Sequence, residues 1–336
     1  MKIKMFFIAG ILACFAAPLA AVAADDPVDG FSPRIRKVYL EPERSVLKKG
    51  KFRFLLAGTA GYDNNANLDS ERQGDSFFQD YFKASFALPL SEKTDARADY
   101  ELVHLLYAAN SKLDLMSNGA RLGLDHKLSQ DIVLSTGYSV DMIDYINTGS
   151  DDYLDNALDV KVTQQLPHKM FHSLACDVLF RYYDHRYTRT PLAASSDKPR
   201  NDWRNTVSYE IGKYFKKDLL KFNVSCFNNN SNDTYLHYYD YNSYKAGASV
   251  THLFNNKLSG LLSYAKQFRD YRTRSLVADP GKTEFERSDL GTAALFYSLN
   301  KSVSFGLNYT YRQNYSNEPI DKYSGSIISL STYYKF

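Results

Sequence analysis

The sequence predicts an all-β protein, a closed, antiparallel, up-and-down transmembrane β-barrel of about fourteen strands. Polar and apolar residues alternate one by one over long segments, almost to the last residue. The chain contains 27 Tyr and 21 Phe but a single Trp, and its formal net charge is only +3. Its N-terminus has the features of an export signal. A soluble α/β enzyme would instead show apolar strands between amphipathic helices.

The first 24 residues have the pattern of a secretory signal peptide. Lys2 and Lys4 precede an apolar run that Pro18 ends, and small residues follow at 21–24. A transmembrane anchor needs about 17 to 25 apolar residues, and this run is too short. We therefore expect residues 1–24 to be a cleaved signal peptide, residues 25–50 a basic periplasmic leader, and residues 51–336 the barrel.

The alternation is clearest near the C-terminus. Val303, Phe305 and Leu307 share one face of the predicted strand, and Ser304 and Gly306 share the other. A period of two is that of a strand whose two faces meet different surroundings. Followed along the chain, the pattern predicts strands at residues 52–62, 77–90, 94–107, 115–127, 130–143, 152–166, 169–185, 201–215, 218–229, 234–254, 257–271, 284–299, 301–314 and 321–336.

The predicted connections alternate in length. Short turns follow the even-numbered strands, around residues 91–92, 129, 167–168, 216–217, 255–256 and 300, and longer polar loops follow most odd-numbered strands. Outer-membrane barrels have short periplasmic turns and long outer loops, so we expect both termini in the periplasm of a Gram-negative bacterium. The register of residues 260–268 is ambiguous because Lys266 shares the face of Leu262 and Tyr264. A total of about twelve to sixteen strands therefore fits the pattern.

The last strand resembles the C-terminal signature by which the barrel-assembly machinery recognises outer-membrane proteins. Phe336 is the terminal residue, and Tyr334 precedes it on the same face. The resemblance implies that these two residues form an assembly signal and that the machinery is a partner. We expect the other partners to be outer-membrane lipids, including lipopolysaccharide, and a periplasmic protein that meets residues 25–50. No nucleic-acid partner is expected.

The polar face of the strands carries charges of both signs, with cations slightly in excess. Fourteen strands spaced about 4.8 Å apart and tilted about 40° leave a lumen about 14 Å wide between side chains. Charges that oppose each other across such a lumen create a transverse field that favours polar solutes. A closed, salt-bridged lumen is the alternative. The residues expected to line the lumen are Arg97, Asp99, Glu101, Arg121, Asp125, Asp141, Asp159, Lys161, Asp177, Arg181 and Arg312.

Candidate catalytic and metal-binding residues are sparse. The seven histidines show no metal-ligand spacing, and no arrangement typical of barrel hydrolases is found, so neither enzyme activity nor a cofactor is expected. The spacing of Asp63, Asn65, Asn67 and Asp69 is similar to the opening of a calcium loop. Leu68 stands where that loop needs glycine, so an Asn-rich turn is the favoured interpretation.

The positions of the cysteines and of the clustered tyrosines bear on disulfide formation and on the role of the aromatic residues. Cys176 and Cys226 fall on the lipid-facing side of strands that are not neighbours, so no disulfide is expected. The tyrosines between residues 235 and 244, with Tyr182, Tyr183 and Tyr187, have two interpretations. They form aromatic girdles at the membrane interface, or they form stacking platforms for sugar rings at the pore mouth.

The run Gly61–Asn65 resembles the "GYDxN" opening of fourteen-stranded barrels linked to surface-lipoprotein display and polysaccharide export. The resemblance covers one strand and its loop. Those families usually carry a periplasmic helical-repeat domain before the barrel, and residues 25–50 do not accommodate one. We therefore expect a pore for passive or weakly selective passage of small hydrophilic solutes, including oligosaccharides. A non-conducting structural or export-accessory barrel is the alternative, and a membrane enzyme is disfavoured.

Overall fold

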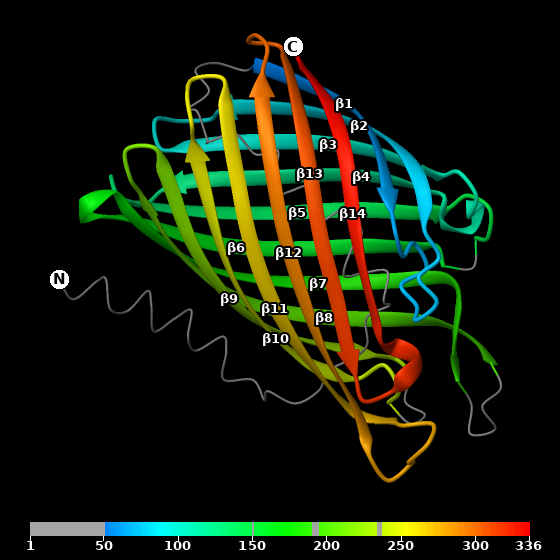
Figure 1. The fold of residues 1–336 in the computed structure, drawn as a ribbon. Coiled ribbons are helices and arrows are strands. Elements are labelled where there is room, and N and C mark those ends of the chain that lie inside the picture. The colour runs from blue at the N-terminus through cyan, green and yellow to red at the C-terminus, as the bar shows by residue number, and fades with distance from the viewer. Residues whose placement is uncertain (1–50, 150, 190–194, 234–236) are drawn as a thin grey trace.

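Fourteen strands close into a single barrel in the computed structural model (Figure 1). The structure describes residues 51–149, 151–189, 195–233 and 237–336, so the predicted signal peptide and leader lie outside the described residues. The strands are β1 Lys51–Asp63, β2 Asp75–Pro89, β3 Thr94–Tyr107, β4 Leu115–Lys127, β5 Ile132–Tyr145, β6 Tyr153–Leu166, β7 Met170–Arg189, β8 Ser195–Tyr214, β9 Asp218–Ser231, β10 Tyr241–Leu253, β11 Leu258–Ser275, β12 Thr283–Ser298, β13 Val303–Ser316 and β14 Tyr323–Lys335.

Each strand pairs antiparallel with its neighbours in the sequence, and β1 pairs with β14 to close the barrel. The predicted fold is thereby confirmed. Two predicted strand ranges were wrong, because β8 begins at Ser195 and β10 begins at Tyr241. Beyond Tyr182 the register between β7 and β8 shifts, which interrupts the alternation on which the prediction relied. Before β10 the chain turns at His237, whose φ is 44°.

The two rims of the barrel differ in the length of their connections. Turns of three or four residues follow the even-numbered strands up to β12, as predicted, and the connections after odd-numbered strands are longer. We call the first the short-turn rim and the second the long-loop rim. β1 begins and β14 ends at the short-turn rim, as Figure 1 shows by the adjacent blue and red ends.

The outward face of the strands is apolar over most of its area. Large apolar side chains remain exposed there, among them Leu122, Leu158, Leu262 and Leu330. An exposed apolar surface that encircles a barrel is suited to lipid rather than water. Cys176 and Cys226 both pair with the same residue of β8, so they lie on one face but are separated by a strand, and both are free thiols. No helix in the described part of the chain is long and apolar enough to cross a membrane.

The seam between β1 and β14 is fixed at both rims. At the short-turn rim, Phe54 and Phe336 exchange backbone hydrogen bonds of 3.0 and 3.1 Å, and their rings lie 5.2 Å apart. At the long-loop rim, the Asn64 side-chain amide donates to Ser326 Oγ, and the Ser326 N–H donates to Asn64 Oδ1. The terminal Phe336 therefore completes the sheet. Its role as an assembly signal with Tyr334 stays a prediction.

Candidate functional site: the barrel lumen

All the residues predicted to line the lumen occupy inward positions in the structure. The strand registers place them opposite one another on the face that lacks the exposed apolar side chains. Their contribution to a solute path stays a prediction. They divide into two groups, one partly exposed at mid-barrel and one buried near the long-loop rim, which the alternation alone did not distinguish.

The first group is a ladder of ion pairs along β2 to β6, which we call the ion-pair wall. Lys83 Nζ lies 2.7 Å from Glu101 Oε1 and 3.8 Å from Asp99 Oδ1. Arg97 pairs with Asp125. The wall consists of Lys83, Arg97, Asp99, Glu101, Arg121, Asp125 and Asp159, and their side chains retain between 17% and 37% of their exposure. Asp141, Lys161 and Asp177 continue the inward face on β5, β6 and β7.

Glycine allows one of these pairs to span a strand. The Arg121 guanidinium on β4 passes over Gly137 of β5 and lies 2.6 Å from Asp159 Oδ1 on β6. A Cβ atom at Gly137 would lie 2.7 Å from Arg121 Cζ and 2.9 Å from Asp159 Oδ1. Such distances are sterically unacceptable, so any larger residue would displace the pair.

The wall on the other side of the barrel is uncharged at this level. In β11 to β14, which the structure describes in full, no charged residue occupies an inward position within 259–267, 288–296, 304–310 or 325–333. Serine, threonine and asparagine prevail there, with small and apolar residues between them. The hydroxyls of Thr292 and Thr310 lie 3.3 Å apart, and those of Thr59 and Ser331 lie 2.9 Å apart. We call this surface the neutral wall.

At mid-barrel, charges of opposite sign on the described strands β4–β6 and β11–β13 do not face each other across the lumen as expected. Strands seven positions apart are diametrically opposite in a closed barrel of fourteen, so β4, β5 and β6 face β11, β12 and β13. The carboxylate partners of Arg97 and Arg121 lie on the same wall as the arginines rather than across the lumen. Neighbouring opposite charges cancel at short range, which weakens the field they would impose on a passing ion.

The second group is a buried cluster near the long-loop rim. Arg181 and Arg312, predicted to line an aqueous lumen, each keep only 3% of their exposure. Arg181 makes bidentate hydrogen bonds of 2.8 and 2.9 Å to Asp155, and Arg312 donates to both carboxylate oxygens of Asp63. We call this set the rim cluster: Asp63, Asp155, Arg181, Tyr183, Arg200, Asp202, Tyr241, Arg269, Tyr271, Glu284, Glu286 and Arg312.

Tyrosine rings pack against the arginines of the rim cluster. The Arg200 guanidinium lies 4.5 Å from the Tyr183 ring and 3.5 Å from the ring of Tyr239 in the loop. Tyr183 and Tyr241 are fully buried and point inward, whereas Tyr182 and Tyr244 are exposed on the lipid-facing side. The Tyr-rich segments therefore serve both faces of the barrel, and neither sequence interpretation describes all of them. Cation–π contacts are strongest where water is excluded, as here.

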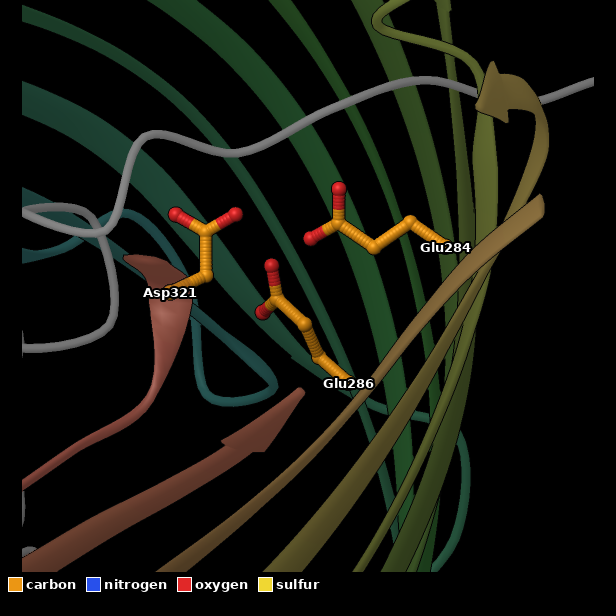
Figure 2. Close-up of side chains that lie close together, drawn as sticks. All are labelled: Glu284, Glu286 and Asp321. Carbon is orange, nitrogen blue, oxygen red and sulfur yellow. The ribbon is translucent and has the colours of Figure 1, made fainter. Parts of the chain in front are cut away.

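Three carboxylates of the long-loop rim lie close together, as Figure 2 shows for Glu284, Glu286 and Asp321. Their oxygens lie within 4.8 Å of one another. Arg274 lies 2.7 Å from Glu284 and 3.0 Å from Asp321, while Arg269 lies 2.7 Å from Glu286. Asp321 is the last residue of the 3-10 turn Pro319–Asp321, in the connection between β13 and β14 at the long-loop rim. Burial raises the pKa of Asp321. Arginine cations therefore already compensate all three carboxylates.

The calcium-like run is a hydrogen-bonded turn. Asp63 accepts from Arg312 and from the backbone N–H of Asn65, and Asp69 accepts from the N–H groups of Glu71 and Arg72. The Asn65 amide donates to the backbone oxygens of Asp69 and Ser324. The side-chain oxygens of Asp63 and Asp69 therefore accept hydrogen bonds from the turn and from Arg312 of β13, and the Asn65 amide links the turn to β14.

Sequence reasoning missed much of the rim cluster. Glu284, Glu286 and Asp202 were not named, although they alternate with apolar or aromatic neighbours at the ends of β12 and β8. The available signal was that acidic residues at the ends of predicted strands have arginines, such as Arg269 and Arg200, at or near the ends of other predicted strands. Alternation fixes the face of a strand, but depth within the lumen depends on strand tilt and register.

The barrel resembles solved outer-membrane proteins in fold. OmpT expressed in the outer membrane of Vibrio cholerae matches with a TM-score of 0.53 and 7% identity, covering 87% of this chain and 100% of that one. The anion-selective porin of Comamonas acidovorans gives 0.51 and 9%, covering 86% and 99%. The outer-membrane channel DcaP of Acinetobacter baumannii gives 0.51 and 13%, covering 85% and 97%. The chain thus has the fold of Gram-negative outer-membrane β-barrels. No protein-family model and no curated protein sequence matches it.

Proposed function

We propose that this protein is an outer-membrane channel, not an enzyme, for small hydrophilic solutes of low net charge, including oligosaccharides. In this proposal the short-turn rim and both termini face the periplasm. The observation that supports it is the division of the mid-barrel lumen into an ion-pair wall and a neutral wall. Serine and threonine hydroxyls both donate and accept hydrogen bonds, so the neutral wall suits the hydroxyl groups of a sugar.

The rim cluster then forms the narrow part of the path. Its arginines and carboxylates are paired and buried, so an ion would have to displace strong partners to pass. A neutral solute does not compete for those charges. Uncharged solutes should therefore pass more readily than ions, and the ionic conductance should be low.

Permeation through proteoliposomes tests the proposal. A neutral disaccharide is expected to enter faster than a charged sugar derivative of similar size. Asn308 and Ser329 are partly buried inward residues that pair across β13 and β14, and replacing them with Leu and Ala removes their polar groups, which is expected to slow the neutral sugar several-fold. Equal entry of both sugars would contradict the solute class. No entry of either, with a folded barrel, would contradict the channel.

A second candidate is a non-conducting structural or export-accessory barrel. The burial of the rim cluster favours it, because a dry ionic layer across the mouth would block even small solutes. Silence in planar bilayers together with impermeable proteoliposomes would support this candidate. A periplasmic partner for residues 25–50 would then be sought by crosslinking.

A further inference from the structure

Charged side chains interrupt the lipid-facing surface of β11 and β12. Lys266, Arg287 and Asp289 lie on the same outward face as Leu262 and Phe268, whose side chains are 63% and 45% exposed. A lysine or arginine that faces hydrocarbon costs about 2–4 kcal/mol at mid-membrane and about 0–1 kcal/mol at the interface. Such residues are therefore expected where lipid headgroups begin.

Their position along the strands agrees with this expectation. Arg287 lies in the part of β12 nearest to the long-loop rim, between Phe285 and the polar pair Lys266–Asp289. On the adjoining β13, Tyr315 pairs with Arg287 and Tyr311 pairs with Gly291, and both tyrosines face outward and are each 40% exposed. Outward tyrosines beside cations are typical of a membrane–water interface.

The hydrogen bonds of this group leave one cation incompletely partnered. Lys266 Nζ lies 3.3 Å from Asp289 Oδ1, and the Tyr264 hydroxyl donates to the same carboxylate. Arg287 Nε lies 3.7 Å from Asp289 Oδ2, too far for a hydrogen bond, and the guanidinium lies 4.2 Å from the Tyr315 ring. Among the described residues, this buried Nε has no hydrogen-bond partner.

The Arg287 guanidinium is only loosely paired with Asp289, and its side chain is 38% exposed, so an anion outside the barrel can reach it. Within the trio of Lys266, Arg287 and Asp289, two cations share one carboxylate, which leaves one positive charge in surplus. Buried donors nearly always have an acceptor. Because the guanidinium fork fits a phosphate and an aromatic ring packs against a sugar face, the chemistry is that of a phosphorylated sugar.

We propose that Lys266 and Arg287 bind a phosphate group of a phosphorylated glycolipid in the outer leaflet, the lipid A part of lipopolysaccharide. Tyr315 packs against its sugar, and its acyl chains lie along Leu262 and Leu295, which are exposed on the same face. The inference rests on the outer-membrane orientation proposed above. It does not depend on whether the barrel conducts.

The test compares two probes on the full-length purified barrel: bisphosphorylated lipid A and the same glycolipid without its phosphates. Bound lipid is measured by native mass spectrometry during titration. Wild-type protein is expected to bind the phosphorylated probe at least about tenfold more tightly, as loss of one charge-assisted hydrogen bond implies. The double variant Lys266→Gln with Arg287→Gln is expected to lose this preference.

Lys257→Gln is the matched control, because Lys257 is an exposed lysine in the short turn at the opposite rim. It is expected to bind like wild type. Equal wild-type affinity for the two probes would overturn the proposal, as would an unchanged preference in the double variant. Equal competition by phosphatidylglycerol would overturn the choice of glycolipid. The wild-type comparison decides the matter even if the double variant does not fold.

Discussion

A single aspartate connects three strands at the long-loop rim. Asp63 ends β1, accepts from Arg312 on β13, and accepts the N–H of Asn65 in the turn that contacts β14. It keeps 1% of its exposure, and Arg312 keeps 3%. Because charges buried this deeply need each other, the aspartate of the GYDxN-like run has a structural explanation in this barrel.

Asp63→Ala is expected to destabilise the barrel by about 3–5 kcal/mol, because it leaves the Arg312 guanidinium buried without its carboxylate. The measurement is urea unfolding in lipid vesicles, followed by the fluorescence of the single tryptophan, Trp203. Glu92→Ala serves as the control. Glu92 is an exposed glutamate in the short turn after β2, and its removal is expected to change stability by less than about 0.5 kcal/mol. Equal effects of the two variants would contradict this account.

Alternation correctly predicted which face of a strand each residue occupies, but it did not predict which residues are buried by contacts with other strands. The faces of Arg97, Arg121 and Asp159 follow from a period of two, which the sequence displays directly. The burial of Arg181 and Arg312 depends on partners such as Asp155 and Asp63, which come from other strands. Those contacts depend on the relative heights of strands around a tilted barrel, which no local pattern encodes.

At the scale of the strand, β9 shows how completely the two faces differ. Val224 and Cys226 face outward and are exposed, whereas Ser225 between them faces inward and pairs with Lys245 in the register of β10. One residue along the strand therefore separates lipid from lumen. The ambiguous register of the predicted strand at 257–271 has the same basis, because Lys266 faces outward and pairs with Asp289.

Thiol labelling in vesicles tests this arrangement. In the wild type, Cys176 and Cys226 are expected to resist a charged, membrane-impermeant maleimide, because both face lipid. In a variant with Cys176→Ser, Cys226→Ser and Ser225→Cys, the new thiol faces the lumen and is expected to react readily. The control is denatured protein, in which all these thiols should react. Fast labelling of the wild type and slow labelling of the variant would reverse the assignment of faces.

The terminal strand offers a second test at this scale. Deleting Phe336 removes two backbone hydrogen bonds to Phe54 and the ring contact at the seam. Outer-membrane assembly is therefore expected to fall several-fold, while export to the periplasm continues. Cell fractionation with and without heating on a denaturing gel measures both steps. Normal assembly of the truncated chain would contradict the predicted assembly role of Tyr334 and Phe336.

For the molecule as a whole, the inward charges are more balanced than expected. The sequence predicts a slight excess of inward cations. The structure adds inward carboxylates at the long-loop rim, including Asp63, Asp155, Asp202, Glu284 and Glu286. Each of these lies in an ion pair with arginine, so neighbouring opposite charges cancel at short range along this rim.

A conducting wild-type barrel is therefore expected to show a reversal potential near zero in a salt gradient. Replacing Arg97 and Arg121 together with Glu creates a surplus of negative charge beside Asp125 and Asp159 and is expected to shift the reversal potential toward cation preference. Lys282→Glu, at a 71% exposed loop residue, is the control for a charge reversal outside the lumen and should cause little shift. Similar shifts in both variants would show that the ion-pair wall does not line the path.

The closure of β1 against β14 also determines when the barrel can be completed. Every other pair joins strands that are consecutive in the chain, so those hairpins form between neighbouring segments. The seam instead joins Phe54 to Phe336, and bringing such distant segments together carries the largest loop-closure entropy of any pair. Until β14 has paired with β1, both edge strands expose unpaired backbone groups, which hydrocarbon does not tolerate. Insertion into a membrane must therefore wait for this final pairing or for a partner that covers the two edges.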